Sequence, residues 1–88
     1  IGEEFEALVN GVTNFGAFVE LPNTIEGLVK INNLGNDYFT YDEENREIIG
    51  KGQKQRFYLG TRVKVQVINA IKETSQIDFK VVEYIGNK

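Results

Sequence analysis

Hydrophobic and polar residues alternate along most of this chain, with the period of two that is typical of β-strands buried on one face. The alternation is clearest over residues 5–9, 16–21, 26–30, 62–67 and 76–80. No stretch has the 3.6-residue period of a helix of ordinary length, although residues 31–34 have room for a single helical turn. The pattern therefore predicts an all-β protein with five short strands.

Parity within these strands predicts which side chains face the core. Ala17 and Val19 share the inner face of the second strand, so Phe18 between them should face outward. In the last strand, Phe79 should face inward and Asp78 outward. Gly11 interrupts the first strand, where we expect a bulge or bend that lets the strand curl into a barrel.

Residues 37–50 depart from this alternation and have the composition of a hairpin. An aromatic group is followed by an acidic run at 42–44, a turn at Asn45 and a returning pair of isoleucines. Tyr38 and Tyr41 should mainly fill a small core of this hairpin; the alternative is that they extend a surface on which bases stack, and on that alternative Tyr38 is a candidate RNA contact. We therefore predict a hairpin inserted between the third and fourth strands.

Five strands, short connections and glycines at the bends match a five-stranded antiparallel barrel of the oligonucleotide-binding (OB) type, with an SH3-like barrel as the structural alternative. At 88 residues the chain has room for one domain, which we place at residues 1–88 with the inserted hairpin at about 37–50. The chain begins with Ile1 and contains no Met, so we expect a fragment of a longer protein.

The composition argues against catalysis by this chain. Without Cys or His it has no thiol, no imidazole and no zinc ligand set. The acids at 42–44 should lie on a solvated tip rather than converge on a metal ion, and Gly50 and Gly52 lack the other positions of a phosphate-binding loop. We expect no catalytic residue, metal, cofactor or small-molecule substrate. Without an apolar run of membrane-spanning length or a secretory leader, we expect a cytoplasmic domain that contacts no membrane.

Charge is distributed unevenly along the sequence. The net charge of -3 and the pI of about 4.9 argue at first against a nucleic-acid partner. Residues 1–47, however, hold ten of the 13 acidic side chains, whereas residues 48–72 hold basic side chains and no acid. These basic residues are Lys51, Lys54, Arg56, Arg62, Lys64 and Lys72. Because screening confines charge effects to roughly 10 Å, such a strip can follow a phosphate backbone, with Arg56, Lys64 and Lys72 as candidate contacts. The alternative is a solvated strand face.

Two aromatic rings are the strongest candidates for a binding site. Phe15 lies in the connection before the second strand, where no core position is required, and Phe18 should face outward. Exposed rings a few residues apart are typical of surfaces on which single-stranded bases stack. Lys30 should flank the rings on the neighbouring third strand, and Asn32 should follow as a hydrogen-bonding group. The alternative is that Phe18 is covered by the inserted hairpin, for example by Tyr38.

The sequence Asn-Gly-Val-Thr-Asn-Phe-Gly-Ala-Phe-Val-Glu-Leu at residues 10–21 resembles the S1 domain, an RNA-binding OB barrel. The resemblance continues through residues 26–31, 59–67 and 76–79, and so covers nearly the whole chain. Motifs between residues 37 and 60 look most like the S1 domain near the C-terminus of bacterial ribonuclease R, a family of processive 3′-to-5′ exoribonucleases.

The resemblance implies a set of site residues. The family's two RNA-facing aromatics fall on Phe15 and Phe18, and its frequent third-strand histidine falls on Lys30. The family's aspartate before the last turn falls on Ile71 and its basic residue four positions later on Ser75, so both groups are lost here. The resemblance therefore implies a stacking platform whose hydrogen-bonding part is incomplete.

The function implied is that of a monomeric accessory module that binds single-stranded RNA by stacking and basic phosphate contacts. It would work with the remaining domains of a parent exoribonuclease, and magnesium is expected only in the catalytic domain, which this chain lacks. The alternative is a degenerate S1 domain that docks on protein, which the acidic N-terminal half and the changes at Ile71 and Ser75 favour.

Overall fold

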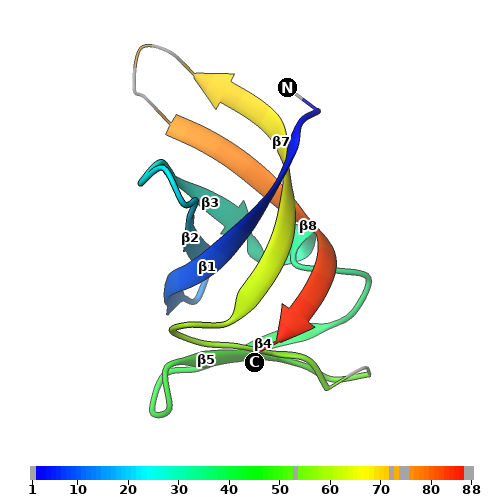
Figure 1. The fold of residues 1–88 in the computed structure, drawn as a ribbon. Helices are drawn as coiled ribbons and strands as arrows, with labels where there is room; N and C mark the ends of the chain where they lie inside the picture. The colour runs from blue at the N-terminus through cyan, green and yellow to red at the C-terminus, as the bar shows by residue number, and fades with distance from the viewer. Residues whose placement is uncertain (1, 53, 72, 74–75, 87–88) are drawn as a thin grey trace.

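The computed structural model describes residues 2–52, 54–71, 73 and 76–86. Along them run eight strands and one turn of 3-10 helix (Figure 1). The elements are β1 (Glu4–Thr13), β2 (Gly16–Glu20), β3 (Glu26–Lys30), η1 (Ile31–Asn33), β4 (Phe39–Asp42), β5 (Glu47–Gly50), β6 (Arg56–Phe57), β7 (Arg62–Ile71) and β8 (Gln76–Gly86). The prediction of an all-β protein is confirmed, and the helical turn lies within the expected residues 31–34.

Five of the strands close into a barrel in the order β1-β2-β3-β8-β7. Four of the pairings are antiparallel, and β3 with β8 is parallel. The predicted five-stranded OB barrel is confirmed, but the expectation that it is antiparallel throughout is corrected at this seam. Strand directions cannot alternate all the way round a closed ring of five, so one neighbouring pair must be parallel. Closure leaves the barrel without a free edge.

The parallel seam closes over Phe79, which is almost completely buried. A Cβ atom on Gly27 would lie 2.2 Å from Cε2 of the Phe79 ring, closer than atoms approach in practice. The missing side chain at Gly27 therefore lets β3 approach β8 over a large core residue.

Parity predicted the inward-facing residues of the barrel well. The buried apolar residues are Ala7, Val9, Ala17, Val19, Leu21, Val29, Leu34, Ile48, Phe57, Val63, Val65 and Phe79. The register of β1 against β2 shifts between Val9 and Gly11, which confirms the predicted bulge.

Asp78 is the exception to the parity prediction. We expected it in solvent, but it is only 7% exposed. It lies at the seam opposite Leu28 of β3, and Nε2 of Gln76 donates a hydrogen bond of 3.3 Å to its Oδ1. Asp78 thus lies beside the parallel seam, and the Gln76 side chain hydrogen-bonds its carboxylate.

The inserted segment is a three-stranded sheet rather than a hairpin alone. β4 and β5 form the predicted hairpin, and β6 pairs with the other edge of β5. The sheet lies across one end of the barrel, beside the end of β8 (Figure 1). Its buried Phe57 ring makes edge-to-face contacts with Phe39 at 5.8 Å and with Tyr84 of β8 at 5.2 Å. β6 was not predicted from the sequence, because a strand of two residues has no period to detect.

Candidate nucleic-acid interface

Phe15 and Phe18 form an exposed aromatic pair on the outside of the barrel. Their ring centroids are 6.1 Å apart and the ring planes lie at 86°, an edge-to-face arrangement. Phe15 is 53% exposed and Phe18 is 40% exposed. The inserted sheet therefore leaves much of Phe18 open, and the prediction that this side chain faces outward is confirmed.

The turn between β1 and β2 fixes where Phe15 lies. The Phe15 backbone N–H donates to Oγ1 of Thr13 at 3.3 Å, and the same hydroxyl donates to the Gly16 carbonyl. The Phe15 carbonyl accepts a hydrogen bond of 2.9 Å from the backbone N–H of Ile31. The turn that carries the first ring is thus tied to the start of η1.

Lys30 lies beside this pair, as predicted. It ends β3 directly opposite Gly16 of β2, and its side chain is exposed. Asn32 follows within η1 and is exposed as well. The strand register places Phe18 and Lys30 on the same outer side of β2 and β3, and the Ile31–Phe15 hydrogen bond brings Phe15 and the start of η1, which carries Asn32, to the same end. We call the surface of Phe15, Phe18, Lys30 and Asn32 the aromatic face.

An open groove runs from the aromatic face toward the parallel seam. It has a volume of about 460 Å³ and is lined by Phe18, Glu26, Gly27, Leu28, Gln76 and Ile77. Leu28 and Gln76 were not among the predicted site residues. Parity alone places Leu28 on the same side of β3 as Lys30, whereas the approach of Gln76 depends on how the barrel closes.

The far end of the β2–β3 surface is acidic. Glu20 lies directly opposite Glu26 across the two strands. The Asn10 side-chain amide donates a 3.1 Å hydrogen bond to Oε2 of Glu26. The surface therefore runs from a basic end at Lys30 to an acidic end at the two glutamates, so an anionic strand should be favoured near Lys30.

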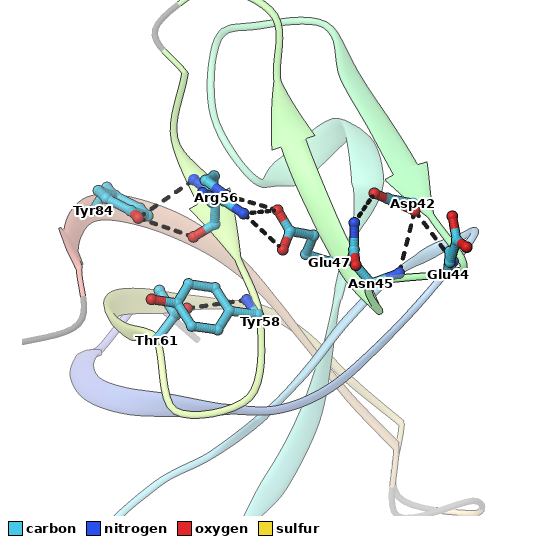
Figure 2. A network of polar contacts seen from close by, with 8 residues as sticks. All are labelled: Asp42, Glu44, Asn45, Glu47, Arg56, Tyr58, Thr61 and Tyr84. Atoms are coloured by element: carbon cyan, nitrogen blue, oxygen red, sulfur yellow. Dashed lines mark hydrogen bonds and ion pairs between the residues drawn. The ribbon is translucent and has the colours of Figure 1, made fainter.

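The predicted basic strip does not form a continuous positive surface. Arg56 makes a two-point ion pair with Glu47: Nε lies 2.7 Å from Oε1 and Nη2 lies 3.0 Å from Oε2 (Figure 2). Two effects of Glu47 raise the pKa of Arg56 above the ordinary value for arginine: the hydrogen bond to the carboxylate, and the negative charge of that carboxylate. Its charge is therefore largely matched within the inserted sheet.

Lys64 also lies among acids. Its Nζ is 3.6 Å from Oε1 of Glu4, and the strand register places it opposite Glu6 on one side and Glu83 on the other. Two members of the predicted strip, Arg56 and Lys64, thus lie beside carboxylates that are distant from them in sequence. Lys72 and Ser75 lie outside the residues that the structure describes.

The two tyrosines of the insert have different environments. Tyr41 is half-buried and packs against the hydrophobic core, in agreement with the prediction. Tyr38 is 84% exposed, so the prediction that it fills the core of the insert is wrong. It precedes β4, and the alternation of that strand therefore does not govern its orientation.

Within the described part of the chain, no group of three or more acidic side chains is arranged to hold a metal ion. The described residues also include no helix of a length and apolarity that would cross a membrane.

Comparison with known proteins agrees with this geometry. Residues 1–81 match the family of S1 RNA binding domains. The chain belongs to the S1 family. Among S1-containing proteins, it is 46% identical over 82 residues to ribonuclease R of Ureaplasma parvum, covering 93% of this chain and 11% of that protein. It is 45% identical over 80 residues to ribonuclease R 1 of Lactococcus lactis, covering 91% of this chain and 10% of that protein.

The fold is also that of a solved ribonuclease. The apo form of Mycoplasma genitalium RNase R superposes with a TM-score of 0.85 at 22% identity, over 93% of this chain and 13% of that chain. The same enzyme in complex with ribose-methylated single-stranded RNA gives the same values. The predicted resemblance to the S1 domain of ribonuclease R is confirmed. The S1 chain described here spans about a tenth of the length of the curated relatives.

Proposed function

We propose that this S1 domain is an accessory module that binds single-stranded RNA on its aromatic face. Phe15 and Phe18 would stack on successive bases, Lys30 would contact a phosphate, and Asn32 would hydrogen-bond a base. The observation that carries the proposal is the pair of half-exposed rings, 6.1 Å apart, at the two positions that S1 domains use for RNA. The complex of Mycoplasma genitalium RNase R with single-stranded RNA supports the same class of ligand.

The expected affinity is modest. Stacking of one base on an aromatic side chain contributes about 1–3 kcal/mol, so two rings would contribute about 2–6 kcal/mol before the cost of association. The isolated module should therefore bind with a dissociation constant between about micromolar and millimolar. Sequence preference should be slight, because every base has a face to stack.

The relatives suggest a setting for this module. We infer that residues 1–88 act as one monomeric cytoplasmic module of a ribonuclease R-type 3′-to-5′ exoribonuclease. On this proposal the module only holds RNA, and hydrolysis with magnesium takes place in a separate catalytic domain. Lys72 stays a predicted phosphate contact, whereas Arg56 and Lys64 would contribute less because carboxylates lie beside them.

The direct test is to replace the rings. Phe15→Ala and Phe18→Ala should each weaken binding of a short single-stranded RNA by roughly 5- to 150-fold, because each removes one stacking surface. Val82→Ala is the matched control, since Val82 is also 40% exposed but lies on β8. Fluorescence anisotropy with labelled RNA measures the affinities. Equal affinities for the wild type and both ring variants, with folding intact, would remove the basis of the proposal.

Docking on protein is the competing function, favoured by the net charge of -3 and by the carboxylates beside Arg56 and Lys64. The dependence of affinity on salt concentration distinguishes RNA binding from docking on protein. RNA binding should weaken with a log–log slope of about -0.7 for each phosphate contact. Docking through the apolar rings should change little with salt.

A further inference from the structure

A third exposed aromatic residue, Tyr38, lies at one end of the inserted sheet. Tyr38 is 84% exposed, more than any other large hydrophobic side chain in the described part of the chain. Its neighbour across the sheet end is Lys51, whose backbone N–H donates a 2.8 Å hydrogen bond to the Tyr38 carbonyl. We call residues 37–38 and 50–52 the tyrosine tip.

The backbone of the tyrosine tip is fixed by one carboxylate. Oδ1 of Asp37 accepts hydrogen bonds from the backbone N–H of Tyr38 at 2.7 Å and of Gly52 at 2.9 Å. Oδ2 accepts from the same Gly52 N–H at 3.1 Å. The exposed ring is therefore carried on an ordered backbone, which lowers the entropic cost of using it to bind.

The glycines of the tip make room for this carboxylate. A Cβ atom on Gly50 would lie 2.7 Å from Oδ2 of Asp37, and one on Gly52 would lie 3.0 Å from Oδ1. The Gly-Lys-Gly sequence thus has a role other than the phosphate-binding loop that it superficially suggests. It allows Asp37 to approach the backbone and leaves Lys51 exposed between the two glycines.

The two ends of the inserted sheet differ in charge, with two lysines and the Asp37 carboxylate at the tip and a run of three acids at the turn. Phe39 pairs with Gly50 at the tyrosine tip, whereas Asp42 pairs with Glu47 at the other end, where the acidic run 42–44 forms the turn. Lys51 and Lys54 are both exposed on the side of the tip. An anionic strand should therefore contact the sheet at the tip and avoid the turn.

The chain connects the tyrosine tip to the aromatic face through η1. Lys30 ends β3, η1 follows at once and is bonded to the Phe15 carbonyl, and Tyr38 comes five residues after η1. In Figure 1 the helical turn lies between the barrel strands and the segment that leads into β4. Lys30 and Tyr38 are thus joined by a segment of seven residues, 31–37, and on this proposal an RNA strand that leaves the aromatic face past Lys30 would follow that segment.

We propose that the tyrosine tip is a second contact for single-stranded RNA, in which Tyr38 stacks on a base and Lys51 contacts a phosphate. This inference rests on the proposed function, because it extends the path of an RNA already held by Phe15 and Phe18. It predicts that RNA long enough to reach the tip binds more tightly than RNA that covers only the aromatic face.

RNA suits this tip better than a protein partner does. One ring is enough to stack on one base, whereas a specific protein interface needs several hundred Å² of contiguous surface on each side. The apolar neighbours of Tyr38 cannot supply that area, since Phe39 and Tyr41 are half-buried and pack against the core. Lys51 lies next to Tyr38 across the end of the sheet, so a base stacked on the ring would have a cation near its phosphate.

The test is the affinity of the 88-residue chain for poly-pyrimidine RNA of about four and about twelve nucleotides, within the site sizes of OB folds. Tyr38→Ala should weaken binding of the longer RNA by at least about fivefold and leave the shorter RNA unchanged. Phe18→Ala should weaken both. Tyr38→Phe should retain binding because the ring is kept, and Gly50→Ala should weaken the longer RNA because it disturbs the Asp37 contacts.

The control is Leu59→Ala, which removes another strongly exposed apolar side chain and should leave both affinities unchanged. Amide spectra of each variant verify the fold. If wild type binds neither RNA, the proposed function itself fails. If Phe18→Ala weakens both RNAs while Tyr38→Ala changes neither, only the tyrosine tip is refuted. Equal loss for both RNAs in Tyr38→Ala would place Tyr38 in the first site and overturn the second contact.

Discussion

Glu47 is buried in the inserted sheet, with an exposed fraction of 7%. Arg56 stabilises this buried carboxylate through an ion pair with two hydrogen bonds. A charged group out of water needs a partner and hydrogen bonds, and removal of one partner leaves the other unsatisfied. The local role of Arg56 is therefore structural, which the sequence could not reveal, because Glu47 and Arg56 meet only after β5 and β6 pair.

Replacement of Arg56 should consequently destabilise the chain. Arg56→Met keeps much of the aliphatic stem but leaves the buried Glu47 carboxylate without its cation, so the thermal unfolding midpoint should fall. Arg62→Met, at another exposed arginine, is the matched control and should change the midpoint less. Circular dichroism melting curves measure both. Equal midpoints for wild type and Arg56→Met would contradict a stabilising ion pair.

Asp42 organises the acidic turn of the insert. Hydrogen bonds from the side chain and backbone of Asn45 lower the pKa of Asp42 below its ordinary value of 3.8 (Figure 2). Because the pKa is lower in the folded than in the unfolded chain, the contribution of this turn to stability is present above the unfolded pKa. It is lost as the pH falls through the lower, folded pKa.

Asn45→Ala should raise the pKa of Asp42 toward 3.8, because it removes the largest of these hydrogen bonds. Carboxyl-carbon NMR titration of wild type and variant measures the shift. A fall in the Asp42 pKa, or no change, would mean that Asn45 does not stabilise the charged carboxylate.

At the scale of elements, the inserted sheet is held on the barrel by Tyr84 of β8. Its hydroxyl donates a 2.9 Å hydrogen bond to the Arg56 carbonyl and accepts one of 3.3 Å from the Arg56 backbone N–H (Figure 2). The ring packs edge-to-face on Phe57. One side chain thus pairs with both backbone polar groups of Arg56, much as a residue of a neighbouring strand would.

Removal of that hydroxyl should loosen the insert selectively. Tyr84→Phe keeps the ring contact and loses the two hydrogen bonds, each with a net contribution of about 0.5–1.5 kcal/mol. Hydrogen exchange should quicken in β5 and β6 more than in β1 and β7. Uniform protection in the variant would show that the hydroxyl does not anchor the sheet.

The elements themselves were largely predictable. The barrel strands, the bulge at Gly11 and the outward Phe18 follow from alternation, since each reflects local geometry. Other features depend on contacts between distant segments: the burial of Asp78, the formation of β6, and the ion pairs that Arg56 and Lys64 make with carboxylates. Period and parity contain no information on such contacts.

At the scale of the whole molecule, the local distribution of charge should decide where RNA binds more than the net charge does. The chain is acidic overall, yet the aromatic face ends at Lys30 and the tyrosine tip at Lys51, with the paired glutamates and the acidic turn at the opposite ends. RNA should be able to follow this surface because screening limits repulsion from distant acids to about 10 Å. If the module works as proposed, tight binding is expected only when further domains add contacts to the same RNA.

Amide chemical-shift mapping shows directly whether the aromatic face binds single-stranded RNA. Titration of the isotopically labelled chain with a short RNA at low salt should shift amides around Phe15, Phe18 and Lys30. Phe15→Ala, Phe18→Ala and added salt should each reduce these shifts. A folded chain that shows no shifts at millimolar RNA, or shifts confined to residues 62–66 of β7, would contradict binding at this face.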